Sequence, residues 1–433
     1  MNIRRVGIVT TGLVTAIVLS NLLTATVGVK KYSESYPAVA CPPTASGMSA
    51  QVSTESKKTP YRKIAGKTEA FIPVKSSRFT IASDPILLDS ADVTSVVWQS
   101  RIGIWAGATL CTSPQGEQWF VGGAADVTSK GRIFLVNSGL SEAIVDVAIW
   151  SENGTQSDKV LTVRANSFIQ VRFDSLAAGQ SRLSVRVTPR SGRISAFMVD
   201  ERGKGLKSLG GDIVNSVESP ATNFVISGIP HQILKGKAGS HVLRILVPGN
   251  ADANIKVDLI SKDGVFTPVG LDGRDVQRGT VTDIALNPTI AASAFSLRIH
   301  SDQPVVAGVF SSLTIFGHPE FLWNSATPQL VPMTLAVNGL TPTLIFTGET
   351  IGLKIQTRLI GGKVVNSTVT GSDIAIWKAP SNSQTIKISG LQPGIYGGGL
   401  VTSTNGIGFF PLIPGSALTR AAIPNSNIWV INR

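Results

Sequence analysis

Cysteine and histidine are scarce in this chain of 433 residues, which has two cysteines, Cys41 and Cys111, and four histidines. Two cysteines can form one disulfide but cannot build a cysteine cage for a metal ion, and the histidines show no ligand spacing. The chain also lacks a G-x-S-x-G nucleophile elbow, a Walker loop and a complete G-x-G-x-x-G dinucleotide motif. The sequence therefore predicts no catalytic, cofactor-binding or metal-binding residues and no enzymatic activity.

Charged side chains are also few, at 15% of the residues against about 25% in an average soluble protein. They are unbalanced, because 39 lysines and arginines face 27 aspartates and glutamates and leave a formal charge of +12. Such a surplus indicates acidic partners, such as anionic lipid headgroups or an acidic cell-wall polymer. Solubility and closeness to a membrane explain the same surplus without a specific ligand. We expect no nucleic acid partner.

Long hydrophobic runs are limited to the N-terminus, where residues 6–29 carry no charge. A helix of that length spans a hydrocarbon core of about 30 Å. Two interpretations fit: residues 1–30 form an uncleaved anchor in the cytoplasmic membrane, or a signal peptide cut near Ala25. Arg4 and Arg5 favour a cytoplasmic N-terminus. The bulk of the chain is then extracytoplasmic, as a single-pass membrane protein or as a secreted one.

Residues 31–78 hold many Ser, Thr, Pro and Lys and few large apolar side chains, a composition typical of a flexible tether. Its seven cations between Glu55 and Arg78 face only two anions, Glu55 and Glu69. One hypothesis is that the tether binds lipid headgroups or wall polymer weakly and with strong salt dependence. The other is a solvated spacer. The seven cations are Lys57, Lys58, Arg62, Lys63, Lys67, Lys75 and Arg78.

Beyond residue 78, short stretches of alternating apolar residues are separated by turn signals, without helical periodicity. FLVNSGLSEAIVDVAIWSENG at 134–154 resembles RILVPGNADANIKVDLISKDG at 244–264, and a weaker third copy begins at 342. Each of the first two copies has a strand, a turn, an alternating strand and an Asn-Gly or Asp-Gly turn. A period of about 105 residues fits one small sandwich. The sequence therefore predicts an all-β chain of three tandem immunoglobulin-like β-sandwich domains, at 79–225, 226–332 and 333–433.

The stretch CTSPQGEQWFVGG at 111–123 contains either a reactive thiol beside a ligand loop or a structural staple. A reactive thiol needs a nearby base or cation, and no local Cys-His signature is present. We therefore expect a disulfide between Cys41 and Cys111. In the chain-entropy model, closing a loop of about 70 residues contributes roughly 4 kcal/mol.

Three tryptophans, Trp98, Trp105 and Trp119, lie around Cys111 in the sequence. If they are exposed, they form a platform for the rings of a sugar ligand, whereas buried tryptophans belong to a hydrophobic core. The apolar residues between them favour the core.

The C…P…WFVGG stretch and the strand QPVVAGVF at 303–310 resemble an actinobacterial family of membrane-anchored, exported, β-rich proteins of unknown function. The resemblance covers roughly residues 90–415. It implies a place in the cell envelope and brings no catalytic residues to this chain.

Three functions remain open at this point. The first is a non-catalytic envelope protein whose sandwiches bind or scaffold a polymer or another envelope protein. The second is a glycan-binding module of the cell wall that uses the three tryptophans. The third is an accessory to an envelope hydrolase or transferase, with a site assembled from distant strands. Exposure of the tryptophans distinguishes the first function from the second.

Overall fold

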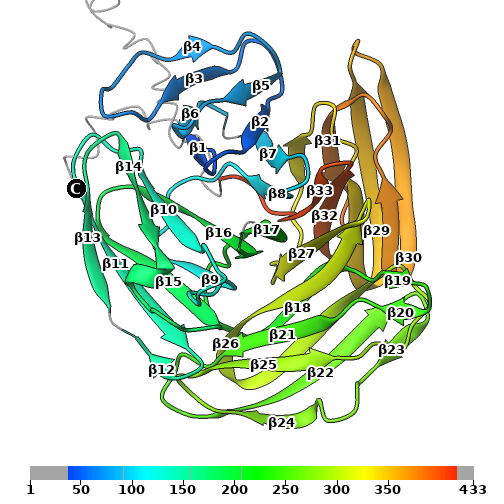
Figure 1. Cartoon of the computed structure of the whole chain (residues 1–433). Helices are drawn as coiled ribbons and strands as arrows, with labels where there is room; N and C mark the ends of the chain where they lie inside the picture. Colours follow the sequence, from blue (N-terminus) through cyan, green and yellow to red (C-terminus); the bar gives the residue numbers. More distant parts are fainter. Residues whose placement is uncertain (1–37, 91, 157, 206, 417–433) are drawn as a thin grey trace, which may run out of the picture. The chain divides into compact units, whose positions relative to one another are not determined.

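The computed structural model describes residues 38–90, 92–156, 158–205 and 207–416, which belong to one compact unit (Figure 1). The regular elements of this unit are β-strands, apart from a single 3-10 turn at Phe173–Ser175. The all-β prediction is therefore confirmed. In the described ranges no helix is long and apolar enough to cross a membrane. The predicted anchor at residues 6–29 lies outside them.

The first sandwich encloses one core between two sheets. It consists of β9 (Gln118–Val121), β10 (Arg132–Asn137), β11 (Ala143–Ser151), β12 (Gly154–Thr155), β13 (Lys159–Val163), β14 (Ser167–Arg172), β15 (Leu183–Ser191), β16 (Ile194–Lys204) and β17 (Lys207–Val214). One sheet has the order β14-β10-β16-β17, and the other has the order β12-β11-β15-β9 with β13 beside β11. Leu135 and Met198 of the first sheet meet Val147 and Val185 of the second. The hairpin predicted from Asn153-Gly154 is present with its turn one residue earlier, since Ser151 pairs with Gly154 and the turn is at Glu152 and Asn153.

The second sandwich repeats this plan with one strand common to both of its sheets. It consists of β18 (Ala221–Pro230), β21 (His241–Leu246), β22 (Ala253–Ser261), β23 (Gly264–Phe266), β24 (Asp272–Val276), β25 (Val281–Leu286), β26 (Ala294–Ile315) and β27 (His318–Ser325), beside a small hairpin of β19 (Ile233–Leu234) and β20 (Lys237–Ala238). The first half of β26 pairs with β18 and β22, and its second half pairs with β21 and β27. The predicted domain limit at 225/226 falls inside β18.

The third sandwich is not a sequential unit, in contrast to the tandem prediction. Its later strands are β28 (Met333–Ala336), β29 (Thr343–Leu359), β30 (Val364–Lys378), β31 (Ser383–Ser389), β32 (Tyr396–Ser403) and β33 (Gly406–Pro411). They share one ten-stranded sheet system with β2 (Ser49–Ser53), β5 (Arg78–Ile81), β7 (Thr94–Arg101) and β8 (Trp105–Leu110). The link is a parallel pairing of β28 with β7. Trp98 and Leu110 accordingly pack in one core with Phe346 and Phe410.

The segment predicted as a flexible tether is folded over residues 38–78, which is a correction to the sequence analysis. Besides β2 and β5 it contains β1 (Val39–Cys41), β3 (Pro60–Lys63) and β4 (Ile72–Pro73), and β1 and β3 pair with β6 (Ile86–Leu88). Its apolar residues are small and few, but Ala50, Val52 and Ile64 are fully buried. Composition suggested disorder because the partners that bury these side chains are distant in sequence. Residues 31–37 lie outside the described ranges.

Strand β33 lies directly against β8, and the absence of a side chain at Gly408 permits this approach. A Cβ atom at position 408 would lie 2.3 Å from the backbone nitrogen of Ala108. We expect Gly408→Ala to lower the free energy of unfolding by about 1–3 kcal/mol, because the strands must separate to admit the methyl group. Urea unfolding measures the loss. Gly249→Ala is the matched control because a Cβ at 249 meets nothing within 4 Å, and equal stability of both variants would contradict close packing.

Candidate functional site: a basic groove beside the third sandwich

A groove lies where the predicted tether meets the third sandwich. Its volume of about 670 Å³ falls within the range of ligand sites in proteins. The first wall comes from the turns before β3 and β5, and the second from the turn after β28, the tip of the β29–β30 hairpin and β31. The lining residues are Ser56, Lys57, Lys58, Ser76, Ser77, Arg78, Asn338, Gly339, Ile360, Gly361 and Gln384.

Side-chain amides fasten the two walls together. Asn338 Nδ2 donates to the carbonyl oxygens of Thr54, at 2.8 Å, and Ser77, at 3.0 Å. Gln384 Nε2 donates to the carbonyl oxygen of Glu55 at 2.8 Å. The two bonds from Asn338 satisfy buried or partly buried groups, and the bond from Gln384 is exposed, so Asn338 is the main tie between the walls.

Arg78 is held in place at the floor of the groove. Its Nε donates to Gln51 Oε1 at 2.8 Å, and its Nη2 donates to the same oxygen. Its guanidinium also lies over Gly339, where a Cβ would approach Nη1 to 2.5 Å. Desolvation lowers the pKa of Arg78, but an arginine stays charged at neutral pH. Arg78 is therefore a positioned cation for an anionic ligand.

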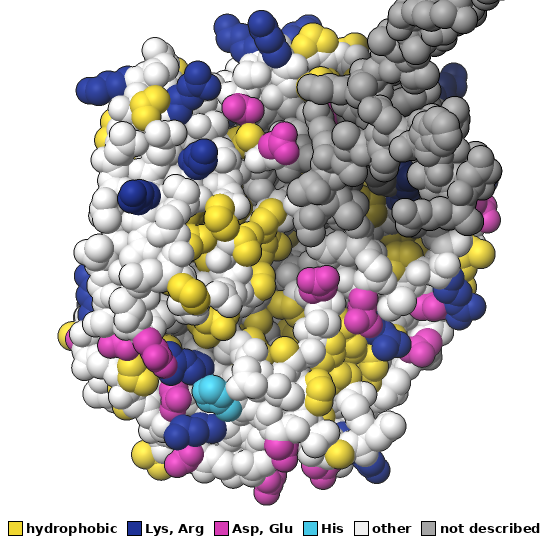
Figure 2. All heavy atoms as spheres, turned by 180° about the vertical axis from the view of Figure 1, so that it is seen from behind, with side chains coloured by type: hydrophobic (Ala, Val, Ile, Leu, Met, Phe, Trp, Pro, Cys, Tyr) yellow, Lys and Arg dark blue, Asp and Glu magenta, His cyan; other side chains and the backbone are white. Residues whose placement is uncertain are grey.

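The groove is cationic because its three charged lining residues, Lys57, Lys58 and Arg78, are all positive. None of the three forms an ion pair within the described part of the chain. Figure 2 shows Lys and Arg gathering at the end of the molecule that carries the β29–β30 tip in Figure 1. The hydroxyls of three serines add donors for oxygen ligands. The site can therefore bind an anion but has no group placed for bond cleavage.

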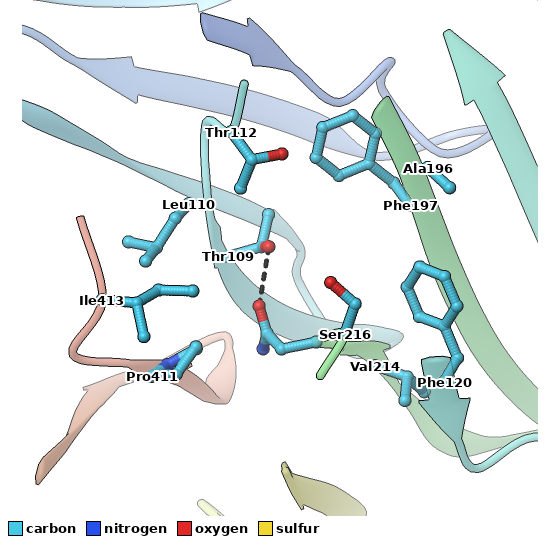
Figure 3. A pocket seen from close by; sticks show the side chains of 11 residues that line it. Thr109, Leu110, Thr112, Phe120, Ala196, Phe197, Val214, Ser216, Pro411 and Ile413 are labelled. Atoms are coloured by element: carbon cyan, nitrogen blue, oxygen red, sulfur yellow. Dashed lines mark hydrogen bonds between the residues drawn. The ribbon is translucent and has the colours of Figure 1, made fainter. Parts of the chain in front are cut away.

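A second cavity, between the first sandwich and the ends of β8 and β33, is too small for a substrate (Figure 3). Its volume is about 20 Å³, room for one water molecule. Thr109 Oγ1 donates to Asn215 Oδ1 across it at 2.7 Å, among apolar side chains such as Leu110 and Phe197. We therefore assign this cavity to packing.

A chain of hydrogen bonds in the second sandwich joins Ser311, His241 and His231. Ser311 Oγ lies 2.9 Å from His241 Nδ1, and His241 Nε2 lies 3.0 Å from His231 Nδ1. A serine bonded to a histidine resembles a catalytic nucleophile with its general base, but Ser311 has no accessible surface. A substrate carbonyl cannot reach the Ser311 oxygen in this arrangement, so the chain of bonds acts in packing. Among the described residues no group of three or more His, Cys, Asp or Glu is placed to hold a metal ion.

Comparison with known families supplies one match, to a family of unknown function, DUF5719, over residues 91–370. The match covers well over half of the chain. This chain belongs to the DUF5719 family. No curated protein and no solved structure matches it. Within this DUF5719 protein, the groove joins residues inside the matched span, such as Ile360, to residues outside it, such as Lys57 and Arg78.

The predicted disulfide of the DUF5719 chain is present. Cys41 and Cys111 are bonded, with their Cα atoms 4.2 Å apart, and both are buried. The bond fastens β1 to the residue after β8, where Ala40 and Thr112 also exchange backbone hydrogen bonds. Cys111 is therefore a staple, and a reactive thiol at this position is ruled out by the bond.

The three tryptophans proposed as a ligand platform are buried and separate. Trp98 is 4% exposed, Trp105 1% and Trp119 2%, and each belongs to a different hydrophobic cluster. Trp119 stacks on Trp150 with their ring centroids 5.2 Å apart. The platform interpretation is therefore wrong for this fold. The three tryptophans are close in sequence, but their strands face different cores.

The seven cations of the predicted tether lie in different environments in the DUF5719 structure. Lys57, Lys58 and Arg78 line the groove, whereas Arg62 is buried and donates to Asn166 Oδ1 at 2.6 Å. The cation excess did identify the basic wall of the site. Gly339 and the β29–β30 tip carried no signal in the sequence, because only the non-local pairing of β28 with β7 brings them to the cations.

Proposed function

We propose that this chain is a non-catalytic, extracytoplasmic binding protein whose basic groove takes the anionic groups of a cell-envelope polymer. The groove carries the proposal, because its lining combines three cations with serine hydroxyls in a ligand-sized space. A phosphate or carboxylate group would pair with these donors through charge-assisted hydrogen bonds. The remainder of the fold then acts as the scaffold that holds the two walls of the groove.

The proposed location is the outer side of the cytoplasmic membrane of an actinobacterium, with three immunoglobulin-like sandwiches beyond an anchor or signal peptide at residues 1–30. The uncharged run at 6–29 supports this location. The disulfide between Cys41 and Cys111 supports it independently, because disulfides persist mainly in oxidising compartments. Lipid headgroups and another envelope protein are the competing partners.

A glycan-binding module that stacks sugars on tryptophan is a weaker candidate, because Trp98, Trp105 and Trp119 are buried. A ligand recognised by charge fits the groove better. No observation favours an accessory to a hydrolase or transferase.

The test removes charge from the groove while leaving Arg78, which is tied to Gln51, in place. We expect Lys57→Gln/Lys58→Gln to weaken binding of tripolyphosphate to the full-length protein about tenfold, which is about 0.7 kcal/mol per lysine and below the limit of about 1 kcal/mol per cation near an anionic surface. Calorimetric titration at low and high salt measures the affinity. The control, Lys237→Gln/Lys262→Gln, removes two exposed lysines outside the groove. Equal affinities of the two variants would overturn the groove as the anion site, and binding to anionic vesicles alone would identify lipid as the partner.

A further inference from the structure

We infer that the groove is one end of a longer track, and that the ligand is a linear anionic polymer lying across the outer face of β29 and β31. This inference rests on the proposed function and names its substrate class. The track consists of Lys354, Gln356 and Arg358 of β29 with Lys387 and Ser389 of β31.

The strand register places these side chains on one face of the sheet. Lys354 is paired with Ser389, Gln356 with Lys387, and Arg358 with Thr385. Residues directly opposite in an antiparallel pair point to the same side. Lys354, Arg358 and Lys387 are exposed, whereas the alternating Ile355 and Ile388 are buried in the core of the third sandwich. The outer face is thus solvent-facing and basic.

The track is continuous with the groove. Arg358 precedes the groove residue Ile360 by two positions, and its partner Thr385 follows the groove residue Gln384 directly. Ile360 is 57% exposed at the hairpin tip, so it offers an apolar contact at the point where the groove opens onto the sheet. The basic end of the track at Arg358 therefore lies next to the groove in the chain, at the hairpin tip.

Opposing charge is absent along the track. Lys354, Arg358 and Lys387 form no ion pair with any described residue. On the other flank of β29, the residues opposite Lys354, Gln356 and Arg358 are Thr368, Asn366 and Val364 of β30, and none of them is acidic. Three unpaired cations and several hydroxyl and amide groups on one face favour a polyanion.

The spacing of the cations indicates a polymer rather than a single small anion. At about 3.4 Å per residue and about 4.8 Å between strands, Lys354 and Arg358 lie about 14 Å apart and Lys387 lies about 8 Å from each. A polymer with one phosphate or carboxylate per repeat of that size would meet successive cations. A single phosphate could contact two neighbouring cations, whereas contact with all three across about 14 Å needs a longer ligand.

The experiment compares short and long probes on the full-length protein at low salt. The probes are tripolyphosphate against long-chain polyphosphate, and a short oligogalacturonate against polygalacturonate, so that phosphate and carboxylate polymers are distinguished. We expect the track variant Lys354→Gln/Lys387→Gln to bind the long probes about tenfold more weakly than wild type and the short probes equally well. The groove variant Lys57→Gln/Lys58→Gln should weaken both.

The outcomes separate this inference from the proposed function. Wild-type affinity of the track variant for both long probes would overturn the track and leave the groove intact. Failure of the wild-type protein to bind any of the four probes would overturn both. Lys237→Gln/Lys262→Gln again controls for net charge. Because all the replaced lysines are exposed, circular dichroism should confirm that each variant keeps the fold.

Discussion

Raising the pH from 6.5 to 8.5 should lower the free energy of unfolding by about 2 kcal/mol, and Glu320→Gln should abolish most of that loss. Glu320 lies on β27 of the second sandwich and is almost fully buried. Its Oε1 accepts hydrogen bonds from the backbone nitrogens of Gly211, on β17, and Phe321. Burial raises the pKa of Glu320 to about 8, although hydrogen bonds from the backbone, including that of Ala106 on β8, act in the opposite direction. One carboxyl therefore touches all three sandwiches.

The sign of the effect follows from where the proton is bound. An unfolded glutamate titrates near pH 4.5, so between pH 4.5 and 8 the folded chain holds a proton that the unfolded chain lacks. Stability contributed by Glu320 is fully present below pH 4.5 and is lost as the pH rises through 8. Asp212 acts in the same direction, because burial raises its pKa well above the usual range while its carboxylate accepts from the backbone nitrogens of Trp323 and Ile213.

His241 opposes Glu320 at lower pH. Burial, and then the neighbouring His231, lower the pKa of His241 from 6.5 to about 4, so its contribution is fully present above pH 6.5 and is lost as the pH falls to 4. Between pH 4.5 and 6.5 the slopes of Glu320 and His241 oppose each other, so the loss due to Glu320 is most visible above pH 6.5.

Urea unfolding of wild type, Glu320→Gln and the exposed control Glu349→Gln at pH 5, 6.5 and 8.5 measures this pattern. Wild type and Glu349→Gln should lose stability between the second and the third value. A Glu320→Gln variant with the same alkaline loss as wild type would show that another group is responsible.

Breaking the Cys41–Cys111 bond should lower the free energy of unfolding by about 4 kcal/mol, within the range of about 2–5 kcal/mol seen for native disulfides. The cysteines are 70 positions apart, and the bond limits the freedom of that whole loop in the unfolded chain. Alanine is the better replacement, because a serine hydroxyl at either buried position would add a desolvation cost of its own.

The measurement compares urea midpoints of wild type and Cys41→Ala/Cys111→Ala, each with and without reductant. Reductant should destabilise wild type and leave the double variant unchanged. If reduced wild type unfolds at the oxidised midpoint, the bond does not contribute to stability. The fragment bounded by the two cysteines should also become more sensitive to protease, because β1 loses its covalent link to the end of β8.

The sequence predicted those features that depend on local pattern. Alternation identified β11 and β22, and the Asn-Gly pair located one hairpin, because strand period and turn geometry are properties of a few neighbouring residues. The isolation of Cys41 and Cys111 was enough to pair them. The cation excess near residue 57 located half of the candidate site.

The missed features depend on pairings between distant segments. Ala50 and Val52 are too small to signal a core by themselves, yet β2 is buried between β5 and β7. Trp98 belongs to the core of the third sandwich because β7 pairs with β28, a connection that no repeat within the sequence reveals. The track on β29 and β31 was missed for the same reason, since Lys354 and Lys387 become neighbours only through strand register.

The parallel pairing of β7 with β28 also imposes an order on the folding of the chain during synthesis. Strands β7 and β8 emerge early, but the partners that cover Trp98 and Leu110 are among the last strands to appear. The hydrogen bond from Gly415 N to Thr94 Oγ1, across 321 positions, forms only when nearly the entire chain is present. Such distant contacts slow folding and leave apolar strand edges uncovered in the meantime. The disulfide between Cys41 and Cys111 can form before those late strands appear, because both cysteines precede them in the chain.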